Sequence, residues 1–478
     1  MSLAVRLIRA LFAFAVILTS YLIQFGLGRL FGRREGPGGA RALPPWLVER
    51  RARVDRTNAR RLLQVMLKLR GVFIKLGQVL SVMGGFLPRV YAKELEQLQD
   101  QVPPQPYRDL VAALRESFGK DPGELFGEIE RTPIAAASLG QVHVARLRDG
   151  RKVAVKFLYP GIRGVIAVYL RVLRLAVLVY RRFVPVARLE RVHESLVDLL
   201  RRETDYLHEA ACMEGMAKNF AGDAGLAFPE VIGELTTKDV LTMTFMEGVK
   251  ITRLEELRRA GVAPSDVALR LIQAFYKMLF VDRFFHADPH PGNFLVEPIG
   301  PAPAGDAGAA PARAFRLVVL DFGAICEARD ELVDGMIDIL KGFFAQDDAQ
   351  VLAGFRRMGF VAPGGNEPLL ERTVRTYFAK LLKIQDRTAG ALIRARPDQL
   401  ERLADPEVER GDLQELMRSF EYPEDWFYVE RACVLMFWLA AQLDPDLDTL
   451  SAGFPYVLPL LAERELAVQP AAGSPRKR

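Results

Sequence analysis

The hydrophobic pattern opens with an uncharged apolar stretch from Ala10 to Gly28. As a helix, about 19 residues rise roughly 28 Å, which is close to the hydrocarbon thickness of a bilayer. Thr19, Ser20 and Gln24 dilute its hydrophobicity, so a membrane span, an interfacial helix and a buried helix all stay open. The stretch lacks a convincing small-residue cleavage site, which makes a removed signal peptide the weaker alternative.

A change of periodicity follows further along the chain. Tyr107 to Phe118 has the apolar spacing of an amphipathic helix. Val142 to Arg148 and Lys152 to Phe157 instead alternate apolar and polar residues around Asp149-Gly150, a dipeptide that favours a type I′ hairpin turn. The pattern therefore predicts two antiparallel strands after a helical region.

The later chain is mainly helical with a few short apolar runs. Arg191 to Phe220 predicts a helix, and Asp239 to Phe245 predicts a buried strand. Asn293 to Val296 and Leu317 to Leu320 are typical of the two arms of a hairpin, and the low-complexity segment Gly300 to Ala314 between them predicts a surface loop. The predicted domains are a membrane segment with its basic flank (1–35), a helical N-terminal extension (36–120), an N-lobe (121–248), a C-lobe (249–470) and a basic tail (471–478).

The net charge indicates which binding partners to expect, and the cysteine content indicates whether disulfides stabilise the fold. The formal net charge is +6 and the pI is about 9.1. No base-stacking aromatic motif accompanies the arginines, so a lipid headgroup surface fits better than nucleic acid. Arginines after the apolar stretch outnumber those before it, and the positive-inside rule then places the rest of the chain in the cytoplasm, at an inner or cytoplasmic membrane. The three cysteines are far apart, which excludes a disulfide framework.

The strongest chemical pattern combines two acids and an amide. His286-Ala-Asp288-Pro-His-Pro-Gly-Asn293 is followed, across the low-complexity segment, by Asp321-Phe322-Gly323. Phosphoryl transfer of the kinase type needs one acid to position the attacking group, and an Asn and a second Asp to hold Mg²⁺ on the phosphates of ATP. Asp288 and Asn293 have the five-residue offset of a kinase catalytic loop. The prolines indicate a loop, which disfavours the alternative of a zinc site at His286 and His290.

A lysine and several acids complete the predicted nucleotide site. Lys156 ends the second hairpin strand in the sequence Val-Ala-Val-Lys, and at this strand terminus its ammonium can meet nucleotide phosphates. Met246 and Glu247 follow the later buried strand, at the position of a kinase hinge, and are predicted nucleotide contacts. In a kinase fold the lysine pairs with a glutamate of a helix. The candidate acids on the predicted helix are Glu203, Asp205, Glu209 and Glu214.

From Gly71 to about Gly323 the chain resembles the UbiB/AarF atypical kinase-like family, which is linked to ubiquinone biosynthesis. Lys75-Leu-Gly-Gln78 is similar to the KxGQ signature of that family, and His286 to Asn293 to its HxDxHPGN loop. Glu203-Thr-Asp205 is similar to its ExD motif. The alanine-rich nucleotide loop that replaces the glycine-rich loop of ordinary kinases matches Ala135, Ala136, Ala137 and Ser138.

The resemblance implies roles for these residues. Glu209 is the helix glutamate expected to pair with Lys156. Lys75 and Gln78 are expected to lie over the active site and contact Glu203 or Asp205, which restricts access by protein substrates. The implied fold is α+β: a bilobal protein-kinase-like fold with a helical N-terminal extension and a predominantly helical C-lobe.

The function predicted from these patterns is that of a membrane-associated atypical kinase or ATPase that uses ATP and Mg²⁺. The resemblance implies that it supports isoprenoid-quinone biosynthesis, with a membrane lipid or quinone precursor and other quinone-biosynthesis proteins as partners. A nucleotide-sensing scaffold without catalysis is the main alternative. A membrane adaptor that binds no nucleotide is the third.

Overall fold

The computed structural model forms two compact units, Met1–Ala211 with Glu230–Phe245, and Cys212–Pro229 with Met246–Arg478. Each unit is described by itself. The described residues are 3–34, 41–69, 77, 89–95, 104–137, 139–183, 197–198, 200–300, 313–362, 364–366, 368–369, 371–372, 388, 419, 421, 423 and 426–468.

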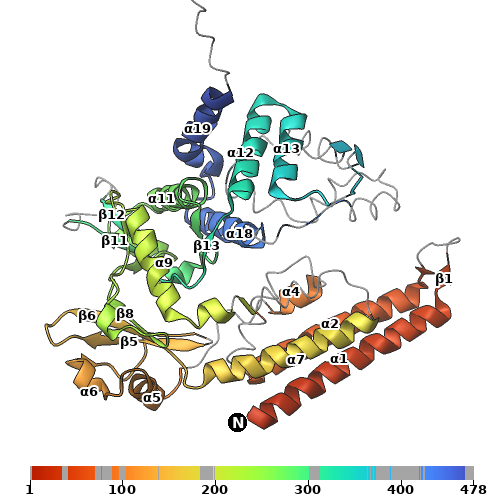
Figure 1. The fold of residues 1–478 in the computed structure, drawn as a ribbon, viewed down its shortest axis with the longest axis horizontal. Coiled ribbons are helices and arrows are strands. Elements are labelled where there is room, and N and C mark those ends of the chain that lie inside the picture. The colour runs from red at the N-terminus through yellow and green to blue at the C-terminus, as the bar shows by residue number, and fades with distance from the viewer. Residues whose placement is uncertain are drawn as a thin grey trace, which may run out of the picture. The chain divides into compact units, whose positions relative to one another are not determined.

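The first unit combines long helices with an antiparallel sheet (Figure 1). Its helices are α1 (Leu3–Phe31), α2 (Pro45–Leu69), α4 (Arg89–Leu95), α5 (Tyr107–Phe118), α6 (Pro122–Leu125), α7 (Ile162–Phe183) and the start of α9 (Tyr206–Asn219), with a 3₁₀ turn at Gly233–Leu235. Its strands are β1 (Arg33–Arg34), β2 (Arg41–Ala42), β3 (Glu128–Ile129), β4 (Ala135–Ala136), β5 (Gly140–Arg146), β6 (Lys152–Leu158) and β8 (Val240–Thr244). The main sheet has the order β3-β5-β6-β8, and β4 pairs with β5.

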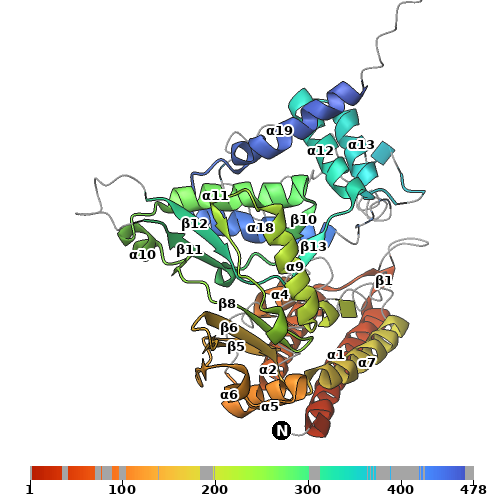
Figure 2. The ribbon, with the colours of Figure 1, turned by 60° about the vertical axis from the view of Figure 1, so that its left-hand side comes forward.

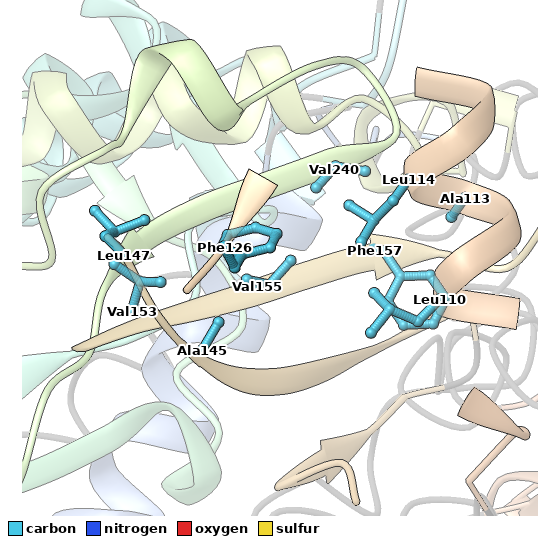
Figure 3. Packing of buried hydrophobic residues seen from close by; sticks show 10 residues of the cluster. All are labelled: Leu110, Ala113, Leu114, Phe126, Ala145, Leu147, Val153, Val155, Phe157 and Val240. Carbon is cyan, nitrogen blue, oxygen red and sulfur yellow. The ribbon is translucent and has the colours of Figure 1, made fainter. Parts of the chain in front are cut away.

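Helix α5 covers one face of this sheet because its apolar residues recur at helical spacing. Leu110, Ala113 and Leu114 are buried against side chains of β5, β6 and β8 (Figure 3). The helix ends at Gly119, whose φ of 67° is a left-handed conformation that glycine adopts without a steric penalty. The predicted bounds of this helix are confirmed, and its packing supports the strand that carries Lys156.

The predicted hairpin is present, but its turn type was wrong. Strands β5 and β6 pair from Gly140↔Leu158 to Arg146↔Lys152. A type I′ turn needs positive φ at both central residues, whereas only Gly150 of the Asp149-Gly150 pair has it, at 90°. Gly150 N donates to Leu147 O over 3.0 Å. The longer loop, with its glycine after the turn, is typical of a hairpin closed by a G1 bulge.

The second unit is mainly helical (Figure 2). After the end of α9 come β7 (Leu226–Ala227), β9 (Val249–Lys250), α10 (Leu254–Arg259), α11 (Pro264–Tyr276), a π-helical turn (Lys277–Val281), β10 (Phe284–His286), a 3₁₀ turn (Pro291–Asn293), β11 (Phe294–Pro298), β12 (Phe315–Val319), β13 (Ile325–Glu327), α12 (Asp330–Ala345), α13 (Asp348–Met358), α18 (Trp426–Leu443) and α19 (Thr449–Val468). Helix α11 packs against α18 and α19.

Two of the remaining predictions are tested by these elements. The predicted hairpin arms are β11 and β12, which pair antiparallel from Phe294↔Val319 to Pro298↔Phe315. The surface loop predicted between them falls largely outside the described residues. A continuous helix from Arg191 to Phe220 was wrong, because helical residues 200–203 are separated from α9 by a turn at Thr204 and Asp205.

Candidate active site

The first cluster joins the sheet to α9 through a buried ion pair. Lys156 lies within β6, between Val142 of β5 and Leu241 of β8, and the predicted position at the strand end was wrong because pairing with β5 continues to Leu158. Its Nζ lies 2.8 Å from Glu209 Oε1 and 3.0 Å from Oε2. The side chains are 17% and 3% exposed, respectively. The expected pair is therefore present, while Glu214, another candidate, is exposed.

The two acids of the ExD motif lie just before α9. Asp205 Oδ1 accepts the His208 backbone N–H over 3.3 Å, which caps the start of this helix. Its other oxygen lies 3.3 Å from Lys238 Nζ. Glu203 is half-buried. Lys75 and Gln78 lie outside the described residues, so their expected contact with the motif stays a prediction.

The alanine-rich loop is tied closely to the edge of β5. Ala135 and Ala136 form β4, opposite Val142 and Gln141. Ala137 N donates to Gly140 O over 2.8 Å. Ser138 lies outside the described residues. Met246 and Glu247 follow β8, the former half-buried and the latter exposed.

A second cluster forms in the second unit around Asp288. Asn293 Nδ2 donates to the Asp288 backbone carbonyl over 3.2 Å. Leu320 N, which precedes Asp321, donates to Asn293 O over 2.9 Å. Ala287 N donates to Ala324 O over 2.8 Å. The pairing of β11 with β12 and of β10 with β13 thus brings the catalytic-loop sequence and the Asp-Phe-Gly sequence together.

The Asp-Phe-Gly segment is held by its own turn and by packing. Asp321 Oδ1 accepts the Gly323 backbone N–H over 3.0 Å. Phe322 is fully buried, and its ring centroid lies 6.1 Å from that of Phe228. The Asp321 carboxylate therefore follows the end of β12. Its backbone is held on one side by the Leu320 hydrogen bond to Asn293 and on the other by the buried Phe322 ring.

His286 is a buried member of this cluster. Burial lowers the pKa of its imidazole below the ordinary value, although neighbouring Asp321 and Asp288 act in the opposite direction. The Asp288 backbone N–H donates to His286 Nδ1 over 3.2 Å, which leaves the proton on Nε2. Among the described residues no group of three His, Cys, Asp or Glu side chains is arranged to hold a metal ion.

Arg431 is a residue that the sequence analysis missed. Its Nη2 lies 2.8 Å from Asp288 Oδ1, and its side chain is only 8% exposed. It comes from α18, 143 positions after Asp288 in the chain. The signal available in the sequence is that Glu430 and Arg431 are charged residues within an otherwise apolar helix, and a charge at a buried position requires a partner.

Comparison with solved structures defines the class of protein. Rv3197 from Mycobacterium tuberculosis, solved in complex with erythromycin, matches 85% of this chain and 97% of its own with a TM-score of 0.53 at 24% identity. The fold is protein-kinase-like, mixed α and β with N-terminal helices, as predicted. Residues 97–354 match the model of the ABC1 atypical kinase-like domain, and the chain belongs to this family.

The chain is also similar to curated relatives. The protein named Activity of bc1 complex kinase 8, chloroplastic, of Arabidopsis thaliana is 29% identical over 434 residues, 86% of this chain and 55% of the relative. The uncharacterized protein sll0095 of Synechocystis is 33% identical over 341 residues, 70% of this chain and 57% of that protein. The chain thus spans a little over half the length of these relatives.

Proposed function

We propose that this chain binds Mg-ATP and acts as an atypical kinase or ATPase. The observation that carries the proposal is the buried Lys156–Glu209 pair on the sheet of a kinase-like fold. An ammonium held by a buried carboxylate has a set position and a retained charge, as a group that binds the α- and β-phosphates requires. Glu209 orients Lys156 in this proposal. The alanine-rich loop, Met246 and Glu247 supply further nucleotide contacts.

The second cluster supplies the proposed metal and acceptor chemistry. Asn293 and Asp321 offer the amide and carboxylate oxygens that Mg²⁺ prefers, and they flank the paired strands β11 and β12. Bound Mg²⁺ neutralises charge on the phosphates. Asp288 positions the nucleophile, which is either water or a hydroxyl of the acceptor.

The proposed substrate class is a lipid rather than a protein. Family membership supports a role in isoprenoid-quinone biosynthesis or lipid handling at a membrane, with quinone-biosynthesis proteins as partners and the kinase-like domain in the cytoplasm. We favour ATP hydrolysis coupled to lipid access. Lys75, Gln78, Glu203 and Asp205 are proposed to restrict access to the site.

One observation favours a second candidate, a nucleotide-sensing scaffold. The proposed nucleophile-positioning carboxylate, Asp288, is already engaged by Arg431 at 2.8 Å. An acid held in an ion pair is less available to accept a proton. Under this second candidate, the chain binds Mg-ATP at the same residues but does not hydrolyse it or transfer its phosphate.

Phosphate release by the purified chain, with and without quinone-like phenols and anionic liposomes, separates the two candidates. Turnover that lipid stimulates supports the enzyme, whereas Mg-ATP binding without turnover supports the scaffold. Asp321→Asn should abolish Mg²⁺-dependent turnover, because it removes a metal-binding carboxylate. Asp446→Asn, which changes an exposed acid of the same unit, should leave turnover as in the wild type. Unchanged turnover in Asp321→Asn contradicts the assignment.

A further inference from the structure

Helix α1 is fixed along one side to its neighbours in the first unit. It runs beside α2 and α7 in both views (Figure 1, Figure 2). Tyr21 Oη donates to Asp55 Oδ1 of α2 over 2.6 Å. Asn58 Nδ2, also on α2 and fully buried, donates to Ser20 Oγ over 2.7 Å. Ser20 and Tyr21 thus attach the apolar stretch to α2.

The opposite side of α1 is an exposed apolar surface. At 100° per residue its members fall within a sector of roughly 80°, on the other side of the helix from Tyr21 and Gln24. Leu30 is 78% exposed and Phe12 70%. We call this surface the outer stripe, and it comprises Ile8, Phe12, Ala15, Thr19, Ile23 and Leu30.

Attachment to α2 is incompatible with a membrane-spanning position of α1. By length and composition alone, Leu11–Phe31 is able to cross a membrane. Helix α2, however, carries nine charged residues among its 25, and each charge is costly in the hydrocarbon layer. To span, α1 would either draw these charges into the bilayer or give up its hydrogen bonds to Asp55 and Asn58.

Charges beside the outer stripe indicate what it contacts. Arg9 and Arg29 are exposed near the two ends of α1, and at 100° per residue each lies about 80° from the centre of the outer stripe, one on either side. An apolar helix face accompanied by arginines is typical of a helix that lies in the interface of an anionic membrane, with its apolar side chains among the acyl chains and its guanidinium groups at the phosphates. A protein partner with an apolar groove would not need this excess of basic residues.

We propose that α1 lies flat on the surface of an anionic lipid bilayer, inserted through the outer stripe, rather than crossing the bilayer. The proposal rests on the membrane association in the proposed function and defines its geometry. Because α1, α2 and the kinase-like sheet belong to one compact unit, the unit that carries Lys156 would be attached to the membrane.

Flotation of the full chain with vesicles tests the contact. Binding should be strong to phosphatidylcholine vesicles that contain phosphatidylglycerol and weaker to phosphatidylcholine alone. Phe12→Asp with Leu30→Asp should reduce binding at least tenfold. Ile299→Asp, at an exposed apolar residue of the second unit, should not. Binding of Mg-ATP, measured separately, should be the same in all three proteins, so a loss of nucleotide binding is distinguished from a loss of the membrane contact.

Depth measurement distinguishes a flat helix from a spanning one. A fluorophore is attached to single cysteines introduced at Ile8, Thr19 or Leu30, in a Cys433→Ser background because Cys212 and Cys326 are buried. Brominated lipids should quench all three labels at the same shallow depth. A label at Thr19 deeper than the other two indicates a span and overturns the proposal. Concentration-dependent dimers that Phe12→Asp dissociates, without vesicle binding by the wild type, overturn it in favour of a second copy.

Discussion

At the scale of single residues, the two side chains of the Lys156–Glu209 pair differ in solvent exposure. Glu209 is almost completely buried, whereas Lys156 keeps 17% of its side chain exposed. An uncompensated buried charge is more costly than an exposed one. The two partners should therefore differ in what their removal does to the stability of the first unit.

A double-mutant cycle on this pair tests the asymmetry. Lys156→Met leaves the Glu209 carboxylate buried without its partner, and should lower the free energy of unfolding by about 3 kcal/mol. Glu209→Gln leaves a lysine that can turn toward water, and should cost about 1 kcal/mol. The double variant should be more stable than the sum of the two losses implies. Urea denaturation measures all four proteins, and simple additivity would mean that the pair is not coupled.

Arg431 gives a second test at the residue scale. Arg431→Ala removes the cation that holds Asp288 Oδ1, so the carboxylate loses its fixed position. If Asp288 positions the nucleophile, kcat should fall by roughly 10- to 100-fold, while KM for ATP changes little. Arg431→Lys keeps the charge and should restore part of kcat. If Arg431 instead blocks the acid, as the scaffold model suggests, Arg431→Ala should raise turnover above the wild type.

At the scale of elements, the alanine-rich loop depends on a glycine at its end. A Cβ added at Gly140 would lie 2.2 Å from Phe157 O and 2.8 Å from Tyr206 Oη. The first contact is with the neighbouring strand and the second with the helix that carries Glu209. Gly140 therefore allows β5, β6 and α9 to approach one another closely around the ion pair.

Gly140→Ala should push these elements apart. Overpacking of this kind typically costs about 1–3 kcal/mol, and the shift of the loop should weaken Mg-ATP binding as well. Gly123→Ala is the matched control, because nothing lies within 4 Å of an added Cβ there. Thermal unfolding and titration with a fluorescent ATP analogue measure the two effects. A Gly140→Ala protein with wild-type stability and affinity would contradict this account of the loop.

At the scale of the whole molecule, nucleotide binding should appear as ligand-induced stabilisation. A ligand that binds only the folded chain at 100 times its Kd adds about 2.7 kcal/mol. Mg-ATP should therefore raise the Tm, and removal of Mg²⁺ with a chelator should reverse most of the rise if Asn293 and Asp321 hold the metal. Asp321→Asn should show the smaller, metal-independent shift at all Mg²⁺ concentrations. Absence of any shift with Mg-ATP would favour an adaptor that binds no nucleotide.

Local patterns predicted the elements that carry the site. The hairpin, the helix over residues 107–118 and the paired strands around the low-complexity segment follow from alternation, helical spacing and turn residues, all of which act over a few positions. The type I′ turn was wrong because the loop between Leu147 and Arg151 has three residues instead of two, and pairing across the strands decides that length. The break at Thr204 and Asp205 was missed because the capping role of Asp205 depends on where α9 begins.

The sequence by itself determined which residues form the strands of the site, the order of its motifs and the family. These properties are local, or depend on motifs that can be recognised one at a time. Only the tertiary structure decided that Arg431 holds Asp288 and that one side of α1 is fixed to α2. Each of these contacts joins residues distant along the chain, and which of several chemically suitable partners meet is decided by packing.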